Sequence, residues 1–184
     1  MWKLCPRNKG FAWWPFLVGI SIGVILLGAF HIVLEKTSTT DFCVSCHGMK
    51  TVYQEYQESI HFNNPSGVRA SCSDCHVPQE FFAKVWRKIK ASREVYHALV
   101  GTIDTPEKFE EHRLDMAQRV WAEMLENDSR ECRNCHTYHA MDFPSQSLRA
   151  REKMESAMLE ERTCIECHKG IAHTKPYSED EFDD

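Results

Sequence analysis

The sequence contains the pattern C-x-x-C-H four times, and no other feature constrains the fold as strongly. In this pattern two thiols form thioethers to a porphyrin edge, and the adjacent imidazole can reach the iron. We therefore predict four covalently bound haems c. The motifs use eight of the nine cysteines and are Cys43/Cys46/His47, Cys72/Cys75/His76, Cys132/Cys135/His136 and Cys164/Cys167/His168.

Zinc sites and disulfide frameworks also use paired cysteines. A histidine directly after the second cysteine, repeated four times, favours haem attachment over both alternatives. The ninth cysteine, Cys5, lies near the N-terminus, outside the motifs. We expect it to be a free thiol in a reducing compartment.

A long apolar run follows a basic N-terminal segment. Residues 11–34 contain no acidic residue, lysine or arginine, and they are long enough to span a bilayer. A cleaved signal peptide is the alternative, but its apolar core is usually shorter and ends at a small-residue cleavage site. Lys3, Arg7 and Lys9 favour a cytoplasmic location for residues 1–10. We predict a single uncleaved span in the bacterial inner membrane, with the haem motifs in the periplasm.

The remaining chain divides into a predicted haem domain, residues 35–176, and an acidic tail, residues 177–184. The first and third motifs are 89 residues apart, and the second and fourth are 92 apart. A duplicated two-haem module would leave such spacing, although the flanking residues do not match, so this is a hypothesis. A periplasmic domain this small needs the haems for much of its core.

The regions between motifs are predicted to be helical, and no segment alternates as a strand would. Over residues 82–100 apolar residues recur at helical spacing among basic ones. This helix could lie on anionic headgroups, which the anchor favours, or keep a solvated basic face and pack on haem. Thr105 and Pro106 predict the start of a second helix that runs to about Glu126. A third is expected over 145–161, so the fold class is mainly α.

Four haems have eight axial positions, of which the motif histidines fill at most four. His61 and His173 follow the first and fourth motifs too closely to bind those haems easily, so we expect each to bind a haem from elsewhere in the chain. His139, His97 and His112 are weaker candidates, and a surface histidine is the alternative for all five. Iron bound by two histidines suits electron transfer, whereas an open position favours chemistry at the iron.

Five segments resemble the NapC/NirT family of membrane-anchored tetrahaem cytochromes c, a family related to NrfH and CymA. They are DFCVSCHGMKTVYQEY, NNPSGVRASCSDCHVP, IDTPEKFEEHRLDMAQ, SRECRNCH and TCIECHKGIAH. Members of that family oxidise quinol at the outer face of the cytoplasmic membrane and pass electrons to periplasmic reductases. The resemblance thus implies menaquinol or ubiquinol as the donor. It also implies a periplasmic nitrate reductase as the acceptor, through its small cytochrome subunit.

The resemblance also implies roles for individual residues. The first motif would carry the haem nearest the membrane, with Met49 rather than His47 on its iron. Lys88 and Glu94 match positions implicated in quinol handling. We assign Lys88 to orienting the quinol and Glu94 to accepting its proton, with Asp41 as a second candidate acid. A surface ion pair is the alternative for Lys88 and Glu94.

The sequence departs from the family at two positions. Gln79 and Glu155 stand where relatives often have histidines that are considered distal haem ligands, so other histidines would substitute or an iron would keep an open site. Two other functions stay open: an anchoring subunit in a stable complex with a multihaem reductase such as nitrite reductase, and reduction of a small substrate at an open haem. We expect no nucleic-acid partner.

Overall fold

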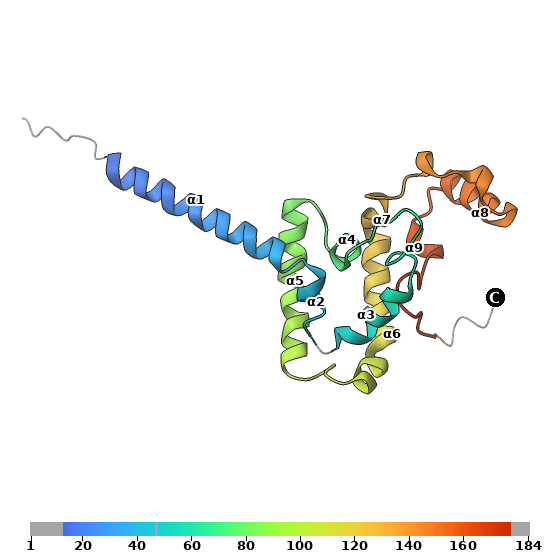
Figure 1. The fold of residues 1–184 in the computed structure, drawn as a ribbon, viewed down its shortest axis with the longest axis horizontal. Helices are drawn as coiled ribbons and strands as arrows, with labels where there is room; N and C mark the ends of the chain where they lie inside the picture. The colour runs from blue at the N-terminus through green and yellow to red at the C-terminus, as the bar shows by residue number, and fades with distance from the viewer. Residues whose placement is uncertain (1–12, 47, 178–184) are drawn as a thin grey trace, which may run out of the picture. The chain divides into compact units, whose positions relative to one another are not determined.

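The computed structural model describes residues 13–46 and 48–177 (Figure 1). The chain divides into two compact units, one ending at Thr37 and the other beginning at Ser38. All regular elements of the described residues are helical, which confirms the mainly α prediction. The predicted cytoplasmic segment, Cys5, His47 and nearly all of the acidic tail lie outside the described residues.

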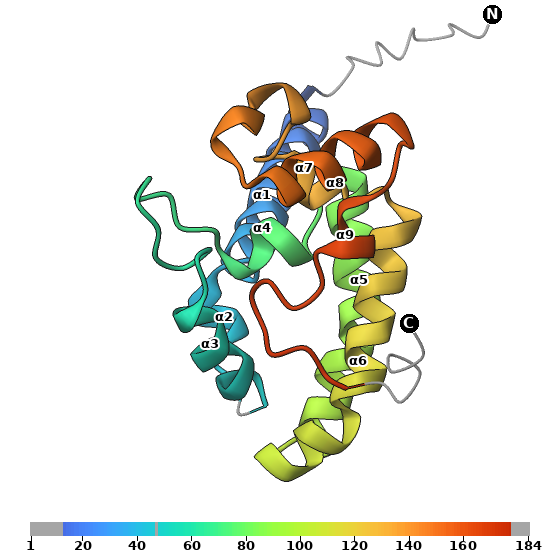
Figure 2. The same cartoon turned by 90° about the vertical axis from the view of Figure 1, so that its right-hand side faces the viewer.

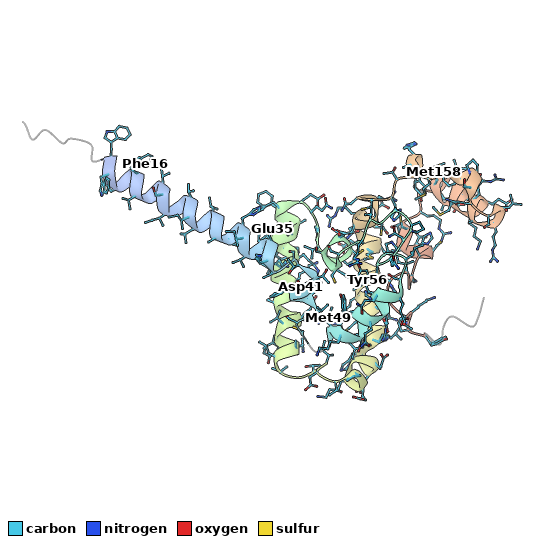
Figure 3. The ribbon with its side chains drawn as sticks, viewed as in Figure 1. Phe16, Glu35, Asp41, Met49, Tyr56 and Met158 are labelled. Carbon is cyan, nitrogen blue, oxygen red and sulfur yellow. The ribbon has the colours of Figure 1, made fainter. Side chains whose placement is uncertain are left out.

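The first unit contains one helix, α1 (Trp13–Lys36). Its 24 residues give a length of roughly 36 Å, which exceeds the roughly 30 Å of a bilayer's hydrocarbon core. Phe16 lies near its start and Glu35 near its end (Figure 3). Among the described residues, α1 is the helix that is long and apolar enough to cross a membrane. The predicted span is therefore helical over its described part and ends two residues later than expected.

The second unit is built on two long helices that run antiparallel, α5 (Phe81–Leu99) and α6 (Pro106–Glu126) (Figures 1 and 2). An ion pair of 3.7 Å between Lys90 Nζ and Glu123 Oε1 links them. The shorter elements are α2 (Thr40–Cys43), α3 (Met49–Glu58), α4 (Cys72–His76), α7 (Arg130–Arg133), η1 (Tyr138–Ala140), η2 (Phe143–Ser145), α8 (Leu148–Leu159) and α9 (Cys164–Cys167).

The predicted helix boundaries agree with the structure where the sequence contains a clear capping residue. The Thr105 hydroxyl accepts the Lys108 amide proton at 3.4 Å, and α6 starts at Pro106 and ends at Glu126 as predicted. The third predicted helix, α8, is shorter than the expected 145–161. Residues 143–145 form a 3₁₀ turn instead, and the Ser147 hydroxyl caps α8 by accepting the Ala150 amide proton at 3.3 Å.

The second unit buries few apolar side chains of its own. Over residues 38–177, apart from residue 47, the buried hydrophobic side chains are those of Tyr56, Phe109 and Ile165. Tyr56 lies on α3 (Figure 3). Three such side chains are a small core for a unit of this size. The pattern fits the expectation that bound haem supplies much of the apolar interior.

Candidate haem-binding site

The four C-x-x-C-H motifs lie on short helices of two kinds. In the second and fourth motifs the helix begins at the first cysteine, so α4 holds both Cys72 and Cys75, and α9 holds both Cys164 and Cys167. Residues three apart share one face of a helical turn, which directs both sulfurs to one porphyrin edge. In the first and third motifs the first cysteine instead lies at or near the end of α2 or α7. This alternation agrees with the hypothesis of a repeated two-haem module.

The second cysteines of the motifs differ in how well the protein covers them. Cys75 is half-buried, because α4 packs on both α2 and α7. Cys46 and Cys135 are exposed, and so is Cys167 at the end of α9. α2 and α7 end before Cys46 and Cys135, whereas Cys167 is the last residue of α9. Haem attachment through the motif cysteines stays a prediction.

Capping boxes start the helices of the second and fourth motifs. The Asp74 carboxylate accepts the Ser71 amide proton at 2.7 Å, and the Glu166 carboxylate accepts the Thr163 amide proton at 3.1 Å. The patterns S-x-x-D and T-x-x-E overlap the haem motifs, so these caps could have been predicted from the sequence. They place each first cysteine in the first turn of its helix.

The four motifs follow one another in space in the order of the chain. α2 packs on α4, with Cys43 close to Cys72. α4 packs on α7, with Cys75 close to Cys132. The third motif meets the fourth through the fully buried Ser129, whose hydroxyl accepts the Ile165 amide proton at 3.0 Å. Each motif therefore neighbours the next, as Figure 2 shows for the order α2, α4, α7, α9.

The structure brings the two predicted distal histidines to motif histidines of other haems. The rings of His173 and His76 have centroids 6.2 Å apart, and those of His61 and His136 are 6.1 Å apart. A metal–imidazole bond is about 2 Å long and a ring nitrogen lies roughly 1 Å from its ring centre, so two imidazoles on opposite sides of one iron have centroids roughly 6 Å apart. Both spacings fit an iron bound by two histidines.

The protonation of these rings also suits a metal. Burial lowers the pKa of His76 to about 4, and nearby His173 adds to the effect, so the ring is neutral at pH 7. His173 Nδ1 donates to the Val52 carbonyl oxygen at 3.1 Å, which leaves the lone pair on Nε2. His61 Nδ1 is buried with no hydrogen-bond partner. A neutral His76 and a His173 with its lone pair on Nε2 are ring states that iron ligation requires.

An ion-pair network holds the segment that carries His173. Arg113 on α6 donates to both carboxylate oxygens of Glu55 on α3, at 2.7 and 3.1 Å. Glu55 accepts the Thr174 amide proton at 3.0 Å, and Arg113 donates to the Thr174 carbonyl at 3.2 Å. The two charged side chains and the Val52 carbonyl therefore fix the residue after His173 and the His173 ring itself. Neither charged residue was predicted, because no sequence motif joins them.

The surroundings of the first motif are described except for His47. Met49 is the first residue of α3 and is half-buried, and Asp41 is exposed on α2 (Figure 3). Gly48, between the motif and Met49, lies against the chain that joins α5 to α6. A Cβ atom there would lie 2.6 Å from the Ile103 carbonyl oxygen, so only glycine permits this contact.

The two candidate quinol residues lie on different sides of α5. Lys88 is half-buried and near enough to Cys43 to lower its thiol pKa, although hydrogen bonding to Cys72 and burial outweigh this effect and the pKa is raised. Glu94 is exposed and pairs with Arg87 at 3.1 Å. At about 100° per residue, positions 88 and 94 differ by about 120° around the helix, whereas 87 and 94 nearly coincide. The structure thus brings Glu94 to Arg87 and not to Lys88.

The remaining candidates have varied surroundings. His139 is exposed on η1, and the motif histidine His168 is exposed at the end of α9. His97 is half-buried, with Nδ1 3.3 Å from the Thr102 hydroxyl, and His112 is half-buried on α6. Gln79 and Glu155, which replace family histidines, are both exposed.

Comparison with known proteins assigns the chain to a family. The family model described as "NapC/NirT cytochrome c family, N-terminal region" matches residues 6–178. The Escherichia coli K12 cytochrome c-type protein NapC is 53% identical over 161 residues, covering 87% of this chain and 80% of the relative. The denitrification system component NirT of Stutzerimonas stutzeri is 51% identical over 169 residues, covering 91% and 84%.

Two further similarities differ in extent. The Escherichia coli K12 cytochrome c-type protein TorC is 50% identical over 181 residues, which cover 96% of this chain but 46% of TorC. A crystal structure described as the cytochrome c nitrite reductase NrfHA complex bound to the HQNO inhibitor covers 89% of this chain and 92% of its own, with 24% identity and a TM-score of 0.49. On the family match and the identity to these relatives, the chain belongs to the NapC/NirT cytochrome c family.

Proposed function

We propose that the protein is a membrane quinol dehydrogenase that passes electrons through four haems c to a periplasmic reductase. The observation that carries the proposal is the spatial order of the motifs. Each motif contacts the next in chain order, and the first begins only a few residues after α1 ends at Lys36. This order supports an electron path that starts close to the membrane and leads away along the chain.

The residues present fit the cofactor. The eight motif cysteines attach the haems, and His173 with His76, and His61 with His136, are the proposed axial pairs of the second and third haems. Haem held by two histidines carries one electron at a time and has no open position for a substrate. Met49 is the proposed ligand of the first haem, and His139 remains a proposed ligand for a position that the two pairs do not fill.

Quinol oxidation needs a group that orients the quinol and a base that receives its protons. Each quinol gives up two electrons and two protons to become quinone. The half-buried Lys88 beside the first motif supports its proposed role of orienting the quinol oxygen. Asp41, exposed in the helix that carries Cys43, is well placed to receive a proton. Glu94 stays a candidate, but its pairing with Arg87 favours Asp41.

The proposal also covers the orientation of the protein in the membrane and the protein that accepts its electrons. The haem unit would lie in the periplasm, with the N-terminus in the cytoplasm. A periplasmic nitrate reductase, through its small cytochrome subunit, is the proposed acceptor, and similarity to NapC supports it. If the protein instead serves as the anchoring subunit of a nitrite reductase, it will purify in a tight stoichiometric complex with that enzyme.

The site assignment is tested by quinol-driven haem reduction with single variants. Lys88→Gln should slow reduction at unchanged haem content, and Asp41→Asn should slow it more strongly at low pH, where fewer other bases are available. Lys90→Gln is the matched control, because Lys90 is on the same helix and its ion pair with Glu123 is exposed. If Lys88→Gln and Asp41→Asn both match wild type, the quinol site lies elsewhere.

The axial ligands are tested by spectroscopy. His173→Ala and His61→Ala should each convert one of the four haems from low to high spin in the EPR spectrum, because each removes one imidazole from a different iron. Arg119→Ala, at an exposed position on α6, is the control and should leave the spectrum unchanged. The same number of low-spin signals in a ligand variant as in wild type would refute that pairing.

A further inference from the structure

The helix α5 carries an exposed apolar stripe that the electron-transfer proposal does not use. Its side chains are between 56% and 85% exposed. They are spaced by four, three, seven and four residues, so they lie along one line of the helix, in which the basic Arg93 takes the place between Ile89 and Tyr96 and which ends at Val100, the residue after α5. The members of this α5 stripe are Phe82, Trp86, Ile89, Tyr96 and Val100.

The α5 stripe faces away from the haem motifs. Arg87 lines a pocket with Cys75 and His76 of the second motif. Lys88 is close enough to Cys43 of the first motif to affect its thiol electrostatically. At about 100° per residue, the centre of the stripe lies roughly 165° around the helix from the midpoint of Arg87 and Lys88. The stripe is therefore on the outer side of α5, and the haems attached to those motifs would not cover it.

The charge around the α5 stripe suits an anionic surface. α5 contains five basic residues and one acidic residue, a net charge of +4, whereas the whole chain has −5. Arg93 is exposed within the line of the stripe, between Ile89 and Tyr96, where its aliphatic stem can lie on apolar surface while its charge reaches headgroups. Trp86 and Tyr96 are the aromatic types enriched at bilayer interfaces. An apolar line with tryptophan and flanking cations is typical of a helix that lies in the membrane surface.

The chain also limits how far the second unit can move from a bilayer. α1 ends at Lys36 and α2 begins at Thr40, and an extended chain covers at most roughly 14 Å over that interval. We propose that the α5 stripe lies in the headgroup–acyl boundary of the membrane that α1 spans, with anionic lipid as its partner. This inference rests on α1 crossing the membrane and is independent of quinol oxidation.

Docking in this way would set the height of the first haem. Lys88, the α5 residue near Cys43 of the first motif, lies about 115° around the helix from the centre of the stripe. An α-helix with its side chains is about 10–12 Å across, so the first motif would be held to one side of α5, within about one helix diameter of the boundary. A quinol headgroup would reach it by passing along the edge of α5 on which Lys88 lies.

The test measures the depth of single nitroxide labels in the full-length, haem-loaded protein. Cys5 is the one cysteine outside the haem motifs, so a Cys5→Ser background leaves an introduced cysteine as the reactive thiol. Ile89→Cys reports on the α5 stripe, and Leu159→Cys is the control, since Leu159 is also apolar and is 79% exposed on α8. Nanodiscs that contain anionic lipid supply the membrane, and Ile22→Cys reports separately on whether α1 is embedded.

The measured quantity is the collision rate of each nitroxide label with two relaxation agents. One agent is oxygen, which concentrates in the acyl chains, and the other is a water-soluble nickel chelate. Each rate is corrected for the relaxation measured under nitrogen. We expect the label at 89 to collide at least several-fold more with oxygen than with nickel, and the label at 159 to show the reverse. Equal, water-like ratios at 89 and 159, with an embedded label at 22, would overturn the proposal. So would protection from both reagents with label–label coupling at 89, which would show a second copy on the stripe.

Discussion

Replacing Arg113 by glutamine tests whether ion pairs hold the distal ligand of the second haem. Arg113 and Glu55 have side chains only 11% and 18% exposed, so solvent screens their interaction weakly. The variant loses two charge-assisted hydrogen bonds to Glu55, two to the exposed Glu110 and one to the Thr174 carbonyl. Stranding one partner of a fully buried pair costs about 3–5 kcal/mol. Because Glu55 keeps the Thr174 amide proton and some contact with water, we expect about 2–3 kcal/mol.

The assay is urea unfolding of the haem-loaded protein, followed by the Soret band. With a slope of about 2 kcal/mol per molar urea, the expected loss lowers the midpoint by about 1–1.5 M. Arg119→Gln is the matched control on α6, because Arg119 is exposed and donates only to the Asp115 carbonyl at 3.2 Å. The low-spin EPR signal of the second haem should also broaden in Arg113→Gln. Equal midpoints and identical spectra for the two variants would refute the role of this ion pair.

Acid adds a second readout to the same variant. Burial raises the pKa of Glu55, but hydrogen bonds from Arg113 and Thr174 outweigh it, so the pKa is below its usual value of 4.5. A lowered pKa stabilises the fold at pH values above 4.5, and this contribution is lost as the pH falls through the folded-state pKa. In Arg113→Gln the pKa of Glu55 rises, so acid unfolding should begin at a higher pH than in wild type. An unchanged acid midpoint would contradict this account of Glu55.

Two further predictions concern the packing of the motifs. Ser129→Ala should lower the free energy of unfolding by about 1–3 kcal/mol in the urea assay, because the buried Ile165 amide loses its acceptor. Ser66→Ala, in an exposed loop, is the control and should cost far less. Equal costs for the two variants would contradict the prediction. Gly48→Ala should lower the free energy of unfolding by about 1–3 kcal/mol and alter the spectrum of the first haem, since the new methyl group would clash with the Ile103 carbonyl oxygen. An unchanged spectrum and urea midpoint would contradict this prediction and show that the α5–α6 connection can shift to make room.

The parts of the fold that local patterns specify could be predicted from the sequence. The start of α6 was predicted from Thr105 and Pro106, and the apolar run predicted α1, because caps and hydropathy act over a few neighbouring residues. The start of α8 was predicted too early. Ser145 and Ser147 are both good caps, and local sequence does not decide between them.

The haem ligand pairs could be predicted only in part. His61 and His173 were expected to reach distant haems, but their partners depend on contacts between segments far apart in the chain, such as Val52 with His173. Hydrophobic periodicity in the sequence does not predict such a contact. The pairing of Glu94 with Arg87 could have been anticipated, because seven residues make almost two whole helical turns while the six from Lys88 do not.

The exposure of the second cysteines was also beyond the sequence motif. C-x-x-C-H reads the same in all four copies, yet Cys75 is half-buried while Cys46, Cys135 and Cys167 are exposed. Cys75 lies in α4, which packs on both α2 and α7, and the motif does not specify such contacts.

The most direct test of the central claim is anaerobic titration of the oxidised protein in nanodiscs with a reduced quinol analogue. We predict that quinol reduces the haems, that each quinol delivers two electrons, and that one proton is released for each electron transferred. A quinol-site inhibitor should block the reduction, while dithionite still reduces all four haems. Haems that stay oxidised with quinol, in a preparation that dithionite reduces fully, would contradict the account.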